Sequence, residues 1–235
     1  MTKVLALDSA TEACSVALIV DGEEASLFEV SPQAHTKLLL PMVDMVLKEK
    51  GILLNDVDFL ACGQGPGSFT GVRIGVSLAQ GLAFGAEKKI VGVCNLEAMA
   101  YRAMVENNFE YCVSVIDARM GEVYLGIYKL VSENETIKIT DEQVLKPEDT
   151  IQFIAKELEN KKFCCCGTGV KTYPQILTQF DLTELDAKYD LPTALSIAKL
   201  ALVKFEKGEA VDPECILPMY IRDTVTWKKV SEQGK

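Results

Sequence analysis

The 235-residue sequence lacks several features that would place it quickly in a functional class. It contains one histidine, His35, and no Cys-x-x-Cys pair among its eight cysteines, so we expect no metal site. No apolar run approaches the ~20 residues of a membrane-spanning helix. The first residues lead into a strand-like segment without signal-peptide organisation. We therefore expect a cytoplasmic protein with reduced thiols and no membrane contact.

A basic face is missing as well. The net charge is −10, and both halves of the chain are acidic. Because neutralisation of phosphates supplies much of the affinity for nucleic acid, we expect no nucleic-acid binding by this chain alone. The Lys228–Lys229 pair is interpreted as part of a solvated tail.

The most informative segment runs from residue 63 to 75 and reads GQGPGSFTGVRIG. It follows a strand-like run, 57–62, and precedes an apolar pattern that predicts a helix over 70–85. Glycine and proline allow a sharp turn there, and Ser68 or Thr70 can cap the helix. No Lys-Ser/Thr follows the glycines, which excludes a Walker-type phosphate loop. The turn is equally consistent with a ligand site and with a packing device.

Small residues recur every four positions along this predicted helix. One ridge carries Gly71, Gly75, Ala79 and Ala83, and a second carries Ser77, Gly81 and Gly85. Each interior glycine costs up to about 1 kcal/mol, and close approach of another backbone explains such a cost. The first ridge is compatible with packing on its own sheet or on a partner chain.

A second predicted helix, 35–50, has apolar residues around more than half of its circumference, which favours a partner surface. His35 begins this helix without an evident carboxylate partner and is interpreted as a cap or surface residue. The predicted partner interface consists of His35, Leu38, Leu39, Met42, Gly71, Val72, Gly75 and Ala79.

The two halves of the sequence repeat one pattern. Each opens with a strand that ends in aspartate, Asp8 or Asp117, and later reaches a strand followed by Gly-x-Gly. Three strands, a helix, a strand and a helix, used twice, predict an α/β protein with the duplicated ribonuclease-H-like fold of actin, sugar kinases and heat-shock ATPases. We expect domains at 1–106 and 107–235, with a C-terminal segment that packs back on the first domain.

In proteins with this fold, nucleotide lies between the halves. A degenerate nucleotide cleft would contain Asp8, Asp117, Arg119, Gly167 and Gly169. The turns after the two aspartates lack the glycines that let phosphate approach backbone amides, and an exposed hairpin arginine is more often a surface charge. We therefore expect weak nucleotide binding or none.

Several segments together closely resemble the bacterial TsaB family, also called YeaZ, over nearly the whole chain. They are Leu5–Thr11, Ala34–Pro41, Gly65–Gly75, Asp117–Tyr124 and Pro218–Arg222. The resemblance implies a role in the synthesis of threonylcarbamoyladenosine in tRNA, where the related TsaD is the transferase and TsaE is an associated ATPase. It implies a non-catalytic subunit that docks on a TsaD-like paralogue, pairs as a homodimer when alone, and meets tRNA only indirectly. It implies no cofactor of its own, with ATP left to the assembled complex.

The same resemblance bears on catalysis. TsaD-like relatives carry His-x-x-x-His after the last strand of the first half, and Asn95 and Met99 stand at those positions here. Neither replaces imidazole as a metal ligand, so a metallopeptidase is not expected. Asn95 is predicted to cap a helix and Met99 to pack in the core. The alternative function is a small ATP-dependent kinase or ATPase that uses Asp8, Asp117 and the Gly167 turn.

Overall fold

The computed structural model describes residues 2–221 and contains two β-sheets, one from each half of the sequence. The first sheet has the strand order β3-β2-β1-β4-β5. β1 pairs antiparallel with β2 and parallel with β4, and β4 pairs parallel with β5. Its strands are β1 (Val4–Asp8), β2 (Ala13–Val20), β3 (Glu23–Val30), β4 (Phe59–Gly63) and β5 (Lys89–Val93). Arg222 and the Lys228–Lys229 pair lie outside the described residues.

Helices cover both faces of the first sheet. α1 (His35–Lys50) and α2 (Phe69–Gly85) lie on one face, and α7 (Ala194–Glu206) lies on the other. Successive side chains of a strand point to opposite faces. Leu5 and Leu7 therefore pack with α1 and α2, whereas Val4 and Ala6 pack against α7.

Local signals set the ends of these helices. Ser68 caps α2, because its side chain accepts a hydrogen bond from the Gly71 N–H at 3.4 Å, as predicted. α1 ends at Gly51, whose left-handed backbone (φ 65°) suits glycine. Thr193 caps α7 in the same way as Ser68 caps α2, accepting from the Ser196 N–H.

The second sheet has the order β10-β6-β7-β8, and β9 also pairs with β7. α3 (Asn95–Asn107) packs on one face, and the other face is covered by α4 (Pro147–Glu157), α5 (Thr168–Thr172) and α6 (Gln175–Thr178). Short 3₁₀ turns lie at Leu54–Asp56, Ala187–Tyr189 and Pro213–Cys215. The strands are β6 (Tyr111–Arg119), β7 (Glu122–Ser132), β8 (Glu135–Lys138), β9 (Gln143–Leu145) and β10 (Phe163–Cys166).

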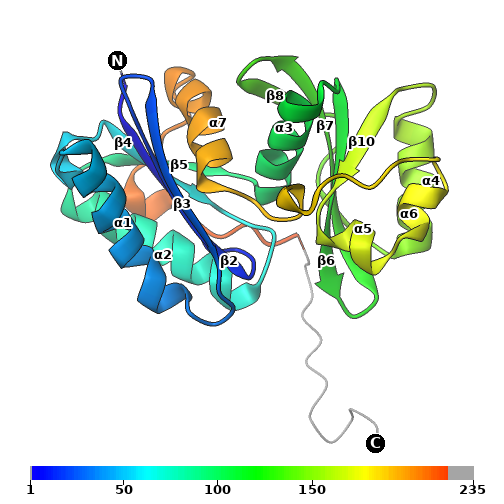
Figure 1. Cartoon of the computed structure of the whole chain (residues 1–235), viewed down its shortest axis with the longest axis horizontal. Helices are drawn as coiled ribbons and strands as arrows, with labels where there is room; N and C mark the ends of the chain where they lie inside the picture. The colour runs from blue at the N-terminus through cyan, green and yellow to red at the C-terminus, as the bar shows by residue number, and fades with distance from the viewer. Residues whose placement is uncertain (1, 222–235) are drawn as a thin grey trace, which may run out of the picture.

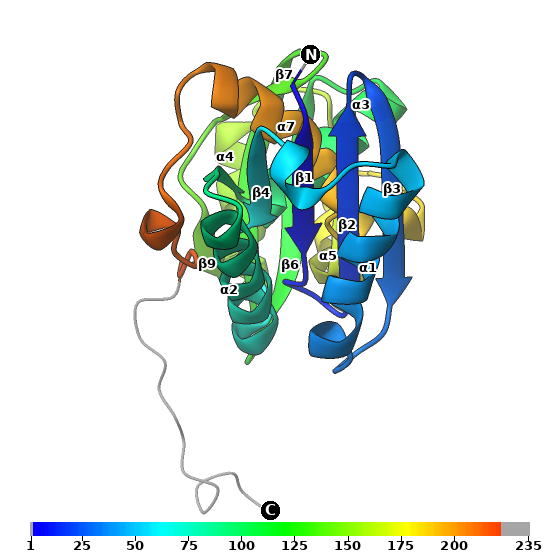
Figure 2. The same ribbon diagram turned by 90° about the vertical axis from the view of Figure 1, so that its left-hand side faces the viewer.

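The layers alternate across the molecule. From left to right, Figure 1 shows α1 and α2, the first sheet, α7 with α3, the second sheet, and α4 to α6. Figure 2 views α1 and α2 from outside, side by side over the first sheet. The two sheets therefore share a central helical layer, to which each half contributes one helix.

The strand order repeats. In both sheets the first three strands of the half are antiparallel neighbours, and a later strand, β4 or β10, pairs parallel with the first. The predicted α/β class is therefore confirmed. The segment 136–144 contributes to both β8 and β9, because the chain leaves β7 after residue 139 and returns to pair with an earlier part of β7.

Two helices cross the predicted domain boundary at residue 106. α3 precedes it but packs on the second sheet, and α7 follows it but packs on the first. The boundary itself stays a prediction. The structure shows that each half contributes one helix, α3 or α7, to the layer between the sheets.

Candidate functional site

The glycine-rich turn after β4 is packed against the turn that follows β1. A Cβ built on Gly67 would overlap the Ala10 carbonyl group, and one built on Gly71 would overlap the Ser9 carbonyl oxygen. The Ser68 N–H donates to the Ala10 oxygen at 2.6 Å. These glycines permit close approach of two protein segments, so the turn serves as a packing device.

Asp8 lies at the centre of this contact and is 1% exposed. Its carboxylate accepts hydrogen bonds from Asn95 Nδ2 at 2.6 Å and from the Ala10 N–H at 3.2 Å. Asn95 Oδ1 in turn accepts from the Gly65 N–H at 2.7 Å. Burial raises the pKa of Asp8 from 3.8 to about 6, and the bonds from Asn95 and Ala10 and the charge of His35 oppose the rise.

Asn95 therefore has a different role from the one predicted. The residue in the cap position of α3 is Cys94, and Asn95 is the first residue of the helix. Its fully buried side chain joins the end of β1 to the glycine-rich turn. Met99, 1% exposed, packs in the core, as predicted.

The second set of predicted cleft residues lies at the ends of β6 and β10. Asp117 accepts hydrogen bonds from the Arg119 N–H at 2.9 Å and from its guanidinium at 3.1 Å. The Asp117 N–H donates to Thr168 Oγ1, between Gly167 and Gly169. The Arg119 side chain is 85% exposed. Among the residues that the structure describes, no hydrogen bond or ion pair joins this set to Asp8.

A segment near the end of the described chain covers the strand ends. The Met219 N–H donates to the Gln64 carbonyl oxygen at 2.7 Å, and Gln64 Nε2 donates to the Leu217 oxygen at 2.9 Å. Met219 and Ile221 then pack against the core cluster of α3, β6 and β10. The carboxyl ends of strands are where open α/β sheets usually bind ligands. Here the chain's own residues lie over them.

The predicted partner interface requires a correction. Seven of its eight residues are buried within the chain, and only Leu38 is partly exposed. Gly75 faces Ser9, whose Oγ would lie 2.8 Å from a Cβ at that position, and His35 Nε2 hydrogen-bonds the Thr11 carbonyl oxygen at 2.6 Å. Small and apolar residues indicate close packing, but their spacing does not show whether they pack within the chain or against a partner chain.

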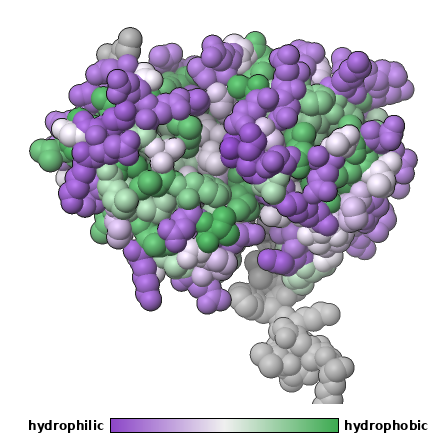
Figure 3. Space-filling model, viewed as in Figure 1, coloured by the Kyte–Doolittle hydropathy of each residue, from purple (hydrophilic) through white to green (hydrophobic). Residues whose placement is uncertain are grey.

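The second small-residue ridge is the one that faces outward. No atom lies within 4 Å of a Cβ built on Gly81 or Gly85. Apolar surface gathers over α1 and α2, at the lower left of Figure 3. We give the name α1–α2 face to six exposed residues of these two helices: Leu40, Pro41, Met45, Ser77, Gly81 and Phe84. Met45 and Phe84 are 56% and 74% exposed.

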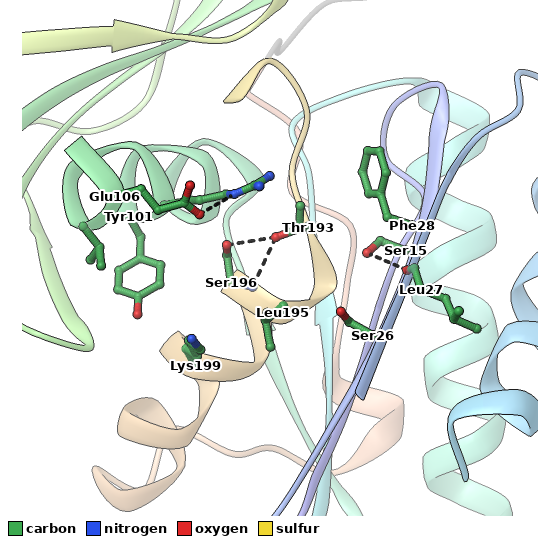
Figure 4. Close-up of a pocket in the computed structure, with 12 residues that line it drawn as sticks. Ser15, Ser26, Leu27, Phe28, Tyr101, Glu106, Thr193, Leu195, Ser196 and Lys199 are labelled. Atoms are coloured by element: carbon green, nitrogen blue, oxygen red, sulfur yellow. Dashed lines mark hydrogen bonds and ion pairs between the residues drawn. The ribbon is translucent and has the colours of Figure 1, made fainter. Parts of the chain in front are cut away.

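A groove of about 260 Å³ lies elsewhere, between β2, β3, α3 and α7 (Figure 4). Its polar groups have partners within the chain. Ser15 Oγ accepts from the Ala194 N–H, Lys199 pairs with Glu24, and Arg102 pairs with Glu106. The first two of these bonds join the halves, and the groove is smaller than the ~300 Å³ at which ligand pockets begin. We interpret it as a seam between the two halves.

The described residues offer neither a metal site nor a membrane span. Within residues 2–221, no three His, Cys, Asp or Glu side chains are grouped as metal ligands would be. None of the helices described is long and apolar enough to cross a membrane.

Comparisons with known proteins agree with the resemblance in the sequence. The model of the family described as "TsaD: tRNA N6-adenosine threonylcarbamoyltransferase" matches residues 28–230. A tRNA threonylcarbamoyladenosine biosynthesis protein TsaB from Haemophilus influenzae is 43% identical, over 97% of this chain and 96% of its own. The TsaB protein of Escherichia coli is 41% identical, over 97% of this chain and 98% of its own.

A solved structure agrees in fold. YeaZ from Pseudomonas aeruginosa superimposes with a TM-score of 0.83 at 39% sequence identity, covering 94% of this chain and all of that one. A shorter match, 40% identical over 35% of this chain, is to a tRNA N6-adenosine threonylcarbamoyltransferase from Chlamydia caviae. The chain therefore belongs to the TsaB family, also called YeaZ.

Proposed function

We propose that this chain is a non-catalytic subunit in the synthesis of threonylcarbamoyladenosine in tRNA and that it docks on a TsaD-family transferase through the α1–α2 face. The observation that carries the proposal is this face itself. It exposes large apolar side chains on two neighbouring helices, and exposed apolar patches are typical of sites of protein association. The curated relatives, named as biosynthesis proteins of this modification, supply the pathway.

The strand-end site supports a non-catalytic role. The Asp8 carboxylate accepts hydrogen bonds from Asn95 and Ala10, and its side chain is buried away from solvent. A metal-bound nucleotide needs a carboxylate that it can reach, whereas both Asp8 oxygens are buried and accept hydrogen bonds within the chain. The duplicated strand order supports the ribonuclease-H-like fold, in which this would be the nucleotide site.

The α1–α2 face also suits pairing with a second copy when the transferase is absent. A self-complementary patch favours a two-fold homodimer. In this proposal a TsaD-like paralogue with an equivalent face replaces the second copy, while a TsaE-like ATPase, ATP and tRNA meet this subunit only in the assembled complex.

The test is a Gly81→Leu variant. A Cβ at Gly81 meets no atom within 4 Å, and leucine is a better helix former than glycine by up to about 1 kcal/mol, so the variant should fold at least as well as wild type. Its side chain should nevertheless keep a partner helix from approaching. We expect a normal thermal melt together with loss of binding to the TsaD-family protein of the same organism, measured by calorimetry.

The matched control is Ala155→Leu, an exposed position on α4 in the other half of the molecule. It adds a leucine of the same size away from the α1–α2 face and should bind as wild type does. A folded Gly81→Leu variant that binds the transferase with unchanged affinity would show that docking lies elsewhere.

A further inference from the structure

One arginine near the start of α2 lies close to two exposed aromatic rings. The Arg73 guanidinium carbon lies 3.3 Å from the centre of the Phe69 ring and 5.3 Å from that of the Tyr220 ring. The ring centres are 6.5 Å apart. Phe69 and Tyr220 are 51% and 53% exposed, so the arrangement lies at the surface. Such stacking holds a flexible side chain in one orientation.

Arg73 has no charged partner in the described part of the chain. Within residues 2–221, its guanidinium makes no hydrogen bond or ion pair. A second stacked arginine provides the contrast: Arg102 lies 5.5 Å from the Tyr189 ring but also bonds Glu106 at 2.9 Å and the Lys188 oxygen at 2.7 Å. Within residues 2–221, Arg102 donates two hydrogen bonds, whereas Arg73 donates none.

The position of Arg73 connects it to the α1–α2 face. Phe69, Arg73, Ser77 and Gly81 are spaced four residues apart and share one ridge of α2. Arg73 is also the only charged residue among the 17 of this helix. A partner that packs on the ridge therefore meets apolar and small side chains and one fixed positive charge.

We infer that Arg73 is the charged anchor of the α1–α2 face and that it binds a carboxylate side chain on the docked TsaD-family protein; this rests on the proposed function. The guanidinium lies against the Phe69 ring and has no hydrogen-bond partner among residues 2–221, and a planar guanidinium with unused N–H groups can pair bidentately with a carboxylate. With a net charge of −10, most of this chain's surface disfavours an acidic group. The pair would therefore fix the register of docking as well as add affinity.

The test compares Arg73→Met and Arg73→Lys in calorimetric titrations with the TsaD-family protein of the same organism. Methionine keeps an apolar stem against Phe69 but removes the charge, and we expect affinity to fall by about tenfold or more. Lysine restores the charge without the bidentate fork and should recover part of the loss. The wild-type affinity should fall with added salt more steeply than that of Arg73→Met.

The control is Lys156→Met, which removes an 80% exposed lysine on α4 and should leave affinity unchanged. Restored affinity when Arg73→Glu meets a partner with one acidic residue changed to lysine would identify the carboxylate and support the inference.

The other outcomes overturn it in distinguishable ways. Unchanged affinity of Arg73→Met, with binding lost in Gly81→Leu, leaves docking intact and refutes the anchor. If Arg73→Met loses only the homodimer, Arg73 binds a second copy of this chain. If it loses only binding to tRNA, Arg73 binds phosphate. Absence of binding by the wild-type chain refutes the docking proposal together with the anchor.

Discussion

The buried carboxyl group of Asp8 should make the free energy of unfolding depend on pH. The substitution Asp8→Asn removes this contribution. The side chain is 1% exposed, and burial raises its pKa from 3.8 to about 6. The hydrogen bonds from Asn95 and Ala10 and the charge of His35 hold the rise to this value. Asparagine has nearly the same shape and does not titrate.

The sign follows from proton binding. Between pH 4 and pH 6 the folded chain retains the Asp8 proton while the unfolded chain has lost it, so the free energy of unfolding falls as pH rises. At about 1.4 kcal/mol for each pH unit, the contribution of this group falls by about 3 kcal/mol over the interval. Its stabilising effect is complete below pH 4 and lost above pH 6.

Urea unfolding of wild type and Asp8→Asn at pH 4, 5, 6 and 7 measures this contribution as the difference between the two proteins. We expect the variant to gain about 3 kcal/mol relative to wild type between pH 4 and pH 7. A constant offset is expected in addition, because an asparagine amide cannot accept hydrogen bonds from both Asn95 and Ala10.

Two results would refute the reasoning. One is a difference in unfolding free energy that stays constant with pH. The other is a carbon-13 titration in which the Asp8 carboxyl group ionises near pH 4. A fall in the pKa of Asp8 on addition of magnesium would contradict its internal role, because it would show that a cation reaches the carboxylate.

Four further predictions concern the isolated chain. Gly75→Leu should lower the melting temperature or prevent folding, because the new side chain would run into Ser9; a wild-type melt would contradict this. Calorimetry with magnesium ATP should show no micromolar site, because Asp8 is buried and bonded to Asn95; one such site per chain would favour the kinase or ATPase alternative. Elemental analysis should find no stoichiometric zinc or iron, because Asn95 and Met99 are both buried and engaged inside the protein; one retained metal per chain would refute this. A gel shift in ~150 mM salt should show no tRNA complex, since the chain carries a net charge of −10 and phosphate contacts supply most such affinity; a clear shift at low micromolar protein would refute it.

The sequence was sufficient for the architecture. Strand-like apolar runs, the 35–50 helix and the capping role of Ser68 agree with the structure, because periodicity and turn chemistry are local properties of the chain. The repeated pattern with strands that end in Asp8 and Asp117 predicted one sheet from each half, and in both sheets the first three strands are neighbours in the same order. Family membership followed from segments spread over the whole chain.

The tertiary structure alone decided which surfaces are available. Gly71, Gly75 and Ala79 form a regular ridge in the sequence, and so do Ser77 and Gly81, yet only the second ridge faces solvent. Both ridges have the same spacing and residue size. The difference arises from the Ser9 turn, which folds onto one side of α2 from a distance of some sixty residues along the chain.

The contacts of individual side chains also depended on the tertiary structure. Asn95 at the start of a helix has the local signature of a cap, but its side chain is drawn to Asp8 and Gly65, which arrive from other strands. Arg73 carried a local signal, as the one charge in an apolar helix, but its stacking partner Tyr220 comes from the far end of the sequence. Local propensity determines which elements form; which of their faces remain open depends on long-range packing, which no short sequence window contains.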